Sequence, residues 1–245
     1  MMSNMYAETK TWNPFVGCNF DCIYCEKSFK RQLKRVAWNI GCPDCYKYTP
    51  HVHPERRFKI PSAKNIFVCG TGDIYFCNPN YVRGNIFWGI ENHKPRRPKT
   101  YFFQSKAPAC FNQYLDWFQT NRDKVILLTT LETNRDIGYE KISKAPVPSK
   151  RFRDFIDLDY CRKVITIEPV LDFDLGEFLG MIRAVDDQLS LEYVWFGFDS
   201  KNCGLLEPSI SKAQDFVDGL QDYGIEVRGK TLRGVHLSEE QKDVL

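Results

Sequence analysis

Strand-like runs alternate with helical patterns along this chain of 245 residues, and no other feature restricts its fold as strongly. Two runs, residues 125–128 and 164–167, are continuously apolar or β-branched, which is typical of parallel strands covered on both faces. We predict strands at residues 11–17, 65–69, 100–104, 124–129, 163–168 and 193–198.

Helical patterns separate the later strands. The apolar residues of 175–185 share one helical face. Asp174 lies just before this predicted helix and Glu177 in its first turn, which is the spacing of a helix cap. Residues 210–220 show the same pattern, with Pro208 suited to the helix start. This alternation predicts an α/β fold with a parallel sheet, and six strand–helix units predict a partial (β/α)6, TIM-like barrel. We expect a single domain over residues 1–245, with a Cys/His-rich insertion at about 41–60 and a loop at 145–149.

Three cysteines stand close together near the start of the chain. Cys18, Cys22 and Cys25 have the spacing C-x3-C-x2-C, with Tyr24 just before the last of them. Thiols this close in sequence are best explained as ligands around one metal centre. A structural zinc site uses four protein ligands, and a cubane iron–sulfur cluster usually takes four thiolates. Three cysteines therefore leave one position open for a small molecule.

This loop resembles the cluster-binding motif of the radical S-adenosylmethionine (radical SAM) superfamily. The resemblance implies that the three cysteines hold a 4Fe–4S cluster, and that the fourth iron chelates S-adenosylmethionine. One electron from the reduced cluster would break a sulfur–carbon bond, and the resulting 5′-deoxyadenosyl radical would abstract hydrogen from a substrate. The resemblance also implies a six-stranded open barrel and an electron donor such as flavodoxin or ferredoxin.

Three further stretches extend the resemblance over most of the chain: WNPFVGC at residues 12–18, IEPVL at 167–171 and VWFG at 194–197. They are similar to sequence motifs of a phage and archaeal branch of the superfamily. This branch is mostly of unknown function and is distantly related to spore photoproduct lyase. The resemblance therefore implies a type of reaction and leaves the substrate open.

Polar residues follow most of the predicted strands. Ligand sites in parallel α/β folds form at the carboxyl ends of strands, so these residues are candidates for binding S-adenosylmethionine. With Tyr24 of the cysteine loop, they are Gly70, Thr71, Gly72, Asp73, Gln104, Ser105, Lys106, Thr130, Glu132 and Glu168. An ordinary glycine turn and a surface lysine are the plainer interpretations of residues 70–73 and of Lys106.

Individual roles can be assigned to some of these residues. Asp73 could bind an ammonium group, and the resembled family has a Gly-rich motif for the methionine amino group here, usually as Gly-Gly-Glu. Lys106 could pair with the methionine carboxylate, and residues 129–134 could bond ribose hydroxyls. Glu168 ranks first outside the cysteines, because a carboxylate ending an apolar strand is costly unless it is paired or faces a site. Residues 197–201 would form a floor for adenine or substrate.

Cys69 and Cys203 lie near predicted strand ends, where a thiol could donate a hydrogen atom to a carbon radical. A free cysteine is more often a small buried hydrophobic residue. The donor hypothesis is wrong if replacing each cysteine by alanine leaves product formation unchanged.

A second metal motif lies in the insertion. It offers two thiolates and two imidazoles, enough for a tetrahedral zinc site, from Cys42, Cys45, His51 and His53. The two histidines are so close in sequence that a site in which only one of them binds the zinc ion is also open. A solvated loop with inert thiols is the alternative. Cys22, Cys25, Cys42 and Cys45 also fit a zinc ribbon, which would make the protein a nucleic-acid or protein-binding module. We favour the cluster, because the ribbon leaves Cys18 without a role.

The net charge and the number of cysteines indicate which cellular compartment and which binding partners to expect for the protein. Ten cysteines without an apolar export signal in residues 1–10 predict a reducing, cytoplasmic compartment, and no apolar run reaches the length of a membrane span. The net charge of +3 is too small to indicate a nucleic-acid partner. Basic residues do gather at Lys27, Lys30, Arg31, Lys34 and Arg35 and at 95–99. They would suit a phosphate-bearing substrate such as a nucleic acid, but we favour a solvated helix face and a basic loop.

Overall fold

The computed structural model describes residues 9–238. Its strands are β1 (Thr9–Trp12), β2 (Phe15–Val16), β3 (His51–Val52), β4 (Asn65–Val68), β5 (Thr100–Gln104), β6 (Val125–Thr130), β7 (Lys163–Ile167), β8 (Leu191–Phe196) and β9 (Val227–Gly229). Its α-helices are α1 (Arg31–Ile40), α2 (Pro43–Lys47), α3 (Pro79–Tyr81), α4 (Trp88–Glu91), α5 (Leu115–Thr120), α6 (Pro148–Ile156), α7 (Leu175–Asp186) and α8 (Ile210–Asp222).

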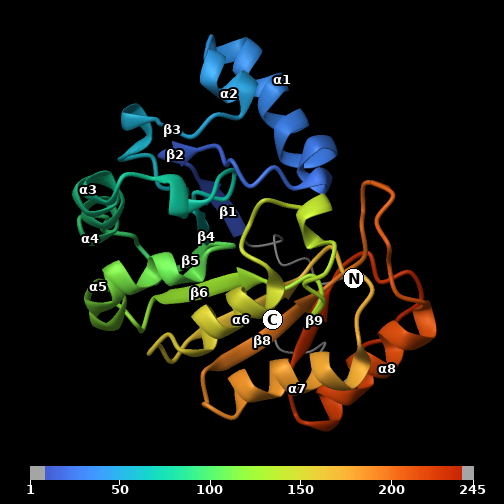
Figure 1. Ribbon diagram of the computed structural model, residues 1–245. Coiled ribbons are helices and arrows are strands. Elements are labelled where there is room, and N and C mark those ends of the chain that lie inside the picture. The colour runs from blue at the N-terminus through green and yellow to red at the C-terminus, as the bar shows by residue number, and fades with distance from the viewer. Residues whose placement is uncertain (1–8, 239–245) are drawn as a thin grey trace.

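Seven parallel strands form the main sheet, in the order β1-β4-β5-β6-β7-β8-β9 (Figure 1). Each strand pairs with the next one along the chain, so the sheet curls as part of a barrel without closing. This confirms the predicted α/β fold and partial TIM-like barrel. The sheet has one strand more than predicted, because β9 is only three residues long and carries no apolar run.

The two faces of the sheet bury different side chains. Alternate strand residues such as Val68, Phe103, Leu127 and Ile165 share one core with the helices packed outside the sheet. The residues between them point to the inner face and form a second apolar cluster: Phe67, Phe102, Ile126, Leu128, Val164, Tyr193 and Trp195. Both faces are therefore covered, as the continuous apolar runs predict.

The two predicted helices form, but one predicted cap is wrong. α7 and α8 pack against the outer face through the expected apolar residues. Asp174 is the first flanking residue of α7, yet it makes no side-chain cap hydrogen bond and instead pairs with Arg135 at 2.6 Å. The start of α8 is capped by Ser209, whose hydroxyl accepts from Lys212 N at 3.2 Å. The loop predicted at 145–149 ends early, because α6 begins at Pro148.

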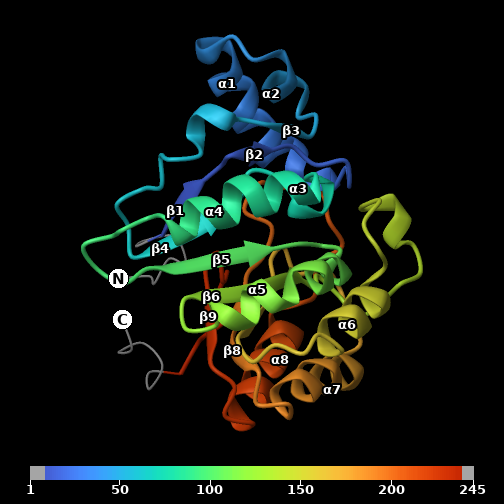
Figure 2. The ribbon, with the colours of Figure 1, turned by 90° about the vertical axis from the view of Figure 1, so that its left-hand side faces the viewer.

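The predicted insertion folds as α2, β3 and their connections. β3 pairs antiparallel with β2, and α1 packs against α2, so this part stands at one end of the molecule, away from α7 and α8 (Figure 2). Among residues 9–238, the structure contains no helix with the length and apolar character needed to cross a membrane.

Candidate active site

The three-cysteine loop leaves β2 and docks on the glycine turn after β4. Gly17 N donates to Thr71 O at 3.2 Å, and Asp73 N donates to Gly17 O at 3.2 Å. The close approach needs glycine at residue 72, where a Cβ would lie 2.7 Å from Gly17 O. Residues 70–73 therefore lie directly against the cysteine loop.

The three thiols gather in one partly buried group. Cys22 is buried beside Phe20, while Cys18 and Cys25 are half-buried against the same cluster. Phe20 N donates to Cys18 Sγ at 3.4 Å, and Cys22 Sγ lies 3.1 Å from Ser143 Oγ. Hydrogen bonds to sulfur are what tune an iron–sulfur cluster.

The surroundings of the loop favour ionisation of one thiol over the other two. The hydrogen bond with Cys25, together with the positive charge of Lys106, lowers the pKa of Cys22 to about 6, although burial opposes the shift. The same hydrogen bond, together with burial, raises the pKa of Cys25, and burial raises the pKa of Cys18. Thiolates are the form that binds metal. The donor set of this loop therefore fits a cluster held by three cysteines.

The last inner-face side chains of β5, β6 and β7 are polar. Gln104 Nε2 donates to Thr130 Oγ1 at 2.7 Å and to Thr166 Oγ1 at 3.1 Å. These three residues continue the inner-face positions of β5, β6 and β7, beyond the apolar residues deeper in the sheet. The period of two along each strand places them together.

Asp73 lies at the centre of the candidate residues after β4 and β5. Its buried carboxylate accepts from Ser105 Oγ at 2.7 Å, from Lys106 N at 2.9 Å and from Tyr75 N at 3.0 Å. Burial raises its pKa to about 6, although these hydrogen bonds oppose the shift. Ser105 therefore acts as a partner of Asp73.

Glu132 is the centre of a buried charged group, which we call the Glu132 cluster: Tyr24, Lys106, Glu132, Tyr139 and Arg151. Its carboxylate accepts from Tyr24, pairs with Lys106, accepts from the Tyr139 hydroxyl at 3.0 Å and lies 2.8 Å from Arg151 Nη1. Burial alone would raise the pKa of Glu132, but the charges of Arg151 and Lys106 lower it to about 2. The two ion pairs thus compensate the charge of the buried carboxylate, although Glu132 Oε2 and Arg151 Nε and Nη2 are buried without a hydrogen-bond partner among the described residues.

The Glu132 cluster joins the cysteine loop to the strand ends. Tyr24 belongs to the loop, and the Lys106 ammonium lies 4.6 Å from the centre of its ring. Burial by itself would lower the pKa of Lys106, but the negative charges of the neighbouring Cys22 and Glu132 raise it. The structure therefore brings together Tyr24, Lys106 and Glu132, which are far apart in the sequence.

Glu168 has partners of its own. Trp195 Nε1 donates to its carboxylate at 2.6 Å, and Lys230 Nζ pairs with it at 3.0 Å. These partners explain how the carboxylate is tolerated at the end of β7. They join Glu168 to β8 and to the segment after β9, and not to the Glu132 cluster.

Cys203 and Cys69 have different surroundings. The loop after β8 rises beside the cysteine loop (Figure 1), with Lys27 Nζ donating to Asn202 O at 2.7 Å and Cys203 Sγ 4.0 Å from Tyr24 O. Cys69 lies fully inside the outer core, where burial raises its pKa. Only Cys203 therefore lies beside the candidate cluster, and its hydrogen-donor role stays a prediction.

The cysteines of the insertion face its histidines. Ligand atoms of Cys42, Cys45, His51 and His53 all lie within 4.8 Å of one another. Cys22 instead contacts Ser143, so the arrangement differs from a ribbon that joins Cys22 and Cys25 to Cys42 and Cys45. The sequence left open whether one or both histidines ligate, and both face the thiols.

Several residues at the site carry no signal in the sequence. Arg151 and Tyr139 complete the Glu132 cluster, and Ser143 reaches Cys22 from the loop after β6. Tyr48 is buried beside the cysteine loop, where burial and the nearby Cys25, Cys18 and Cys22 raise its pKa. None follows a strand directly, so only the folded chain shows their position.

Some of the basic residues form ion pairs or hydrogen bonds with nearby groups of the protein. Lys30 and Lys34 pair with Glu26 at 3.2 and 3.3 Å, and Lys99 Nζ donates to Pro61 O at 3.0 Å. Arg31 and Arg35 are exposed on α1. The solvated helix face that the sequence favours agrees with these pairs.

No family model and no curated protein matches this chain. Solved structures with a related chain path include native anSMEcpe with bound AdoMet and Cp18Cys peptide, at 11% identity and a TM-score of 0.47. The same protein with AdoMet alone, and with AdoMet and Kp18Cys peptide, gives 10% identity and a TM-score of 0.47. Each match covers 92% of this chain and 64% of the other, so this chain spans less than two thirds of that protein's length.

Proposed function

We propose that this protein is a radical SAM enzyme, of the phage and archaeal branch that its sequence resembles. One observation carries the proposal: the three thiols of the cysteine loop lie beside the buried polar groups at the carboxyl end of a parallel sheet. Tyr24 of the cysteine loop donates to Glu132, and the Lys106 ammonium lies 4.6 Å from the centre of the Tyr24 ring, which supports a shared site. A metal with an open position and a polar ligand pocket would therefore share one site.

The cysteines would hold the cluster, and the strand ends would hold S-adenosylmethionine. When bound, a 4Fe–4S cluster supplies the electron that cleaves S-adenosylmethionine and so gives the radical that abstracts hydrogen. Asp73 offers a carboxylate for the amino group, and Lys106 an ammonium for the carboxylate. Lys106 already pairs with Glu132, so binding the methionine carboxylate requires it to exchange or share that partner.

The remaining candidates would orient the nucleoside part. Glu132 and Thr130 offer acceptors for ribose hydroxyls, and Tyr24 offers an aromatic face beside the cluster. Gln104 bridges Thr130 and Thr166 and would fix their hydroxyls. Glu168, held by Trp195 and Lys230, would contact S-adenosylmethionine from the end of β7. Closing such a site within the barrel shields a radical from water.

The substrate is unidentified, and a nucleic acid or nucleotide is the candidate that we propose to test first. Arg31 and Arg35 on α1 and the basic segment 95–99 would supply phosphate contacts. We also propose a flavodoxin or ferredoxin as the electron donor. Binding to nucleic acid that does not weaken with rising salt, or no binding, would contradict this choice of substrate.

The test is cleavage of S-adenosylmethionine by anaerobically reconstituted, chemically reduced protein. We expect methionine and 5′-deoxyadenosine from the wild type and from the control Cys161→Ser, which changes an exposed cysteine away from the loop. Cys22→Ala should abolish the reaction. Protein that holds zinc but neither iron nor sulfide, or a Cys22→Ala variant that still cleaves, would remove the basis of the proposal.

A further inference from the structure

We propose that Cys42, Cys45, His51 and His53 bind one zinc ion in a closed structural site, which fixes the backbone on which the cysteine loop rests. His51 Nε2 lies 3.4 Å from Cys42 Sγ and 3.3 Å from Cys45 Sγ, while His53 Nε2 lies 3.1 Å from Cys45 Sγ. Zinc–sulfur and zinc–nitrogen bonds of ordinary length set such atoms roughly 3.3–3.8 Å apart in a tetrahedron. The three sulfur–nitrogen distances lie within this range or a few tenths of an ångström below it, and all four ligand atoms lie within 4.8 Å of one another.

The outer nitrogens of both imidazoles are already occupied. His51 Nδ1 lies 2.7 Å from Thr49 O, and His53 Nδ1 lies 2.8 Å from Glu55 Oε1. Because both partners are acceptors, each Nδ1 carries a proton and each Nε2 presents a lone pair. Metal-bound histidines are typically held in this way by a carbonyl or carboxylate behind the ring.

The Nε2 atoms of the two imidazoles face each other as well as the thiols. His51 Nε2 and His53 Nε2 are 2.9 Å apart, a distance at which two acceptors repel unless a cation lies between them. Two thiols stand at the same place, and Cys45 N donates to Cys42 Sγ at 3.3 Å, which holds the two cysteines on one side of the group. Two thiolates and two neutral imidazoles make a donor set suited to zinc.

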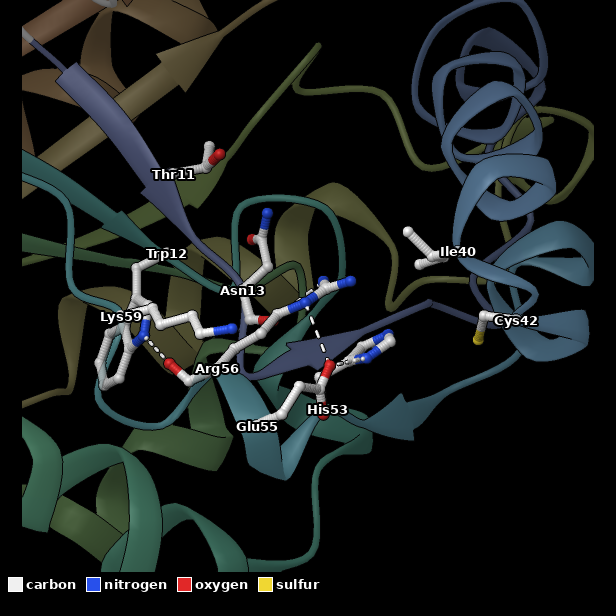
Figure 3. Close-up of a pocket in the computed structure, with 9 residues that line it drawn as sticks. All are labelled: Thr11, Trp12, Asn13, Ile40, Cys42, His53, Glu55, Arg56 and Lys59. Carbon is white, nitrogen blue, oxygen red and sulfur yellow. Dashed lines mark hydrogen bonds and ion pairs between the residues drawn. The ribbon is translucent and has the colours of Figure 1, made fainter.

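Burial and access fit a structural ion. Cys45 and His53 are buried, whereas Cys42 and His51 are half-buried. Cys42, His53 and Glu55 line a pocket of about 660 Å³, and Figure 3 shows Glu55 bonded to the His53 ring at its edge. The pocket gives the ion a path of entry, while four protein ligands leave no open position for chemistry.

The zinc site lies directly behind the cysteine loop. Val16 pairs with His51 across β2 and β3, and Cys18 N donates to Tyr48 O at 3.3 Å. Gly17 has φ +97° and lies so close to this segment that a Cβ would stand 2.3 Å from Thr49 O. A zinc ion that joins α2 to β3 would fix residues 48–50, and so the position of Gly17 and Cys18. This role, unlike zinc binding itself, rests on the proposed function.

The experiment measures zinc and iron per chain in three full-length variants, expressed with both metals present. Cys42→Ser/His51→Asn should lose zinc, while Cys18→Ser/Cys22→Ser/Cys25→Ser should lose iron and keep one zinc. The control Cys161→Ser/His236→Asn, at two exposed positions, should keep both. Zinc that persists in the first variant, or that disappears with Cys22 and Cys25, overturns the site.

A fourth variant guards against simple misfolding. His51→Cys offers three thiolates and one imidazole, so it should still bind one metal. With cobalt in place of zinc, its thiolate-to-metal absorption should rise about 1.5-fold, as two thiolates become three. Unchanged absorption would exclude His51 as a ligand and overturn the site.

The role of the ion has its own readout. Iron reconstituted into Cys42→Ser/His51→Asn should fall at least about fivefold below the control, because the support of Cys18 is loosened. Full iron loading would overturn this role and leave the zinc result standing. If the wild type takes up no iron at all, the proposed function fails, and zinc binding is still decided by the zinc measurement.

Discussion

The carboxylate of Glu132 and the guanidinium of Arg151 face each other inside the protein, with 2.8 Å between Oε2 and Nη1 and both side chains 0% exposed. Glu132 lies two residues beyond the end of β6, and Arg151 reaches it from α6, nineteen residues later along the chain. Arg151 Nη1 also donates to Thr130 O, so the ion pair ties α6 to the end of the strand that carries the site.

Removing Arg151 should destabilise the fold. In Arg151→Met the Glu132 carboxylate stays buried with less compensation, which typically costs about 3–5 kcal/mol. The control Arg153→Met, at an exposed position of the same helix, should change the free energy of unfolding by less than about 0.5 kcal/mol. Urea unfolding measures both. A loss in Glu132→Gln/Arg151→Met equal to the sum of the two single losses would contradict direct coupling.

Asp73 should make stability fall as pH rises. Its pKa is 3.8 without the fold and about 6 within it, so between these values the native state binds more protons than the unfolded state. Relative to Asp73→Asn, the wild type should lose roughly 3 kcal/mol across this window, because each pKa unit corresponds to about 1.4 kcal/mol. Unfolding of both proteins from about pH 4 to about pH 7 measures the difference. A difference that is flat, or that rises with pH, would contradict the buried environment.

Gly17 should be required for the position of the cysteine loop. In Gly17→Ala the new Cβ meets Thr49 O at 2.3 Å, and φ is +97°, so we expect a loss of about 1 kcal/mol or more and reduced iron uptake. Gly84→Ala is the matched control, since nothing lies within 4 Å of its Cβ and it is helical. That change should stabilise by about 0.5–1 kcal/mol. Equal effects of both substitutions would rule out the close approach.

Lys106 should be required for binding S-adenosylmethionine. Lys106→Met removes the buried ammonium proposed for the methionine carboxylate, and we expect affinity to fall at least tenfold, about 1.4 kcal/mol. Lys144→Met is the control, because Lys144 is exposed and pairs with Asp21 at the surface. Equilibrium binding to the reconstituted protein measures both. Unchanged affinity in Lys106→Met would show that Lys106 serves only its pairing with Glu132.

The sequence by itself determined the sheet and which polar residues lie at its carboxyl end. Runs such as residues 125–128 place strands, because buried parallel strands must be apolar on both faces. Polar residues just after the strands, such as Asp73 and Glu132, converge because parallel strands end at the same edge. The spacing of Cys18, Cys22 and Cys25 already groups three thiols in one loop.

Only the tertiary structure decided which partners these residues have. The charge of Glu132 is compensated by Arg151 and Tyr139, and no local sequence pattern connects these residues to it. A buried charge needs a partner, and the tertiary packing decides which side chain lies close enough to be that partner. For the same reason, Glu168 accepts a hydrogen bond from Trp195 and forms an ion pair with Lys230. The folded chain also directs Cys42 and Cys45 to the two histidines, since the pairing of β2 with β3 carries His51 and His53 back over α2. Sequence spacing allowed both the histidines and the ribbon, and long-range packing chose between them.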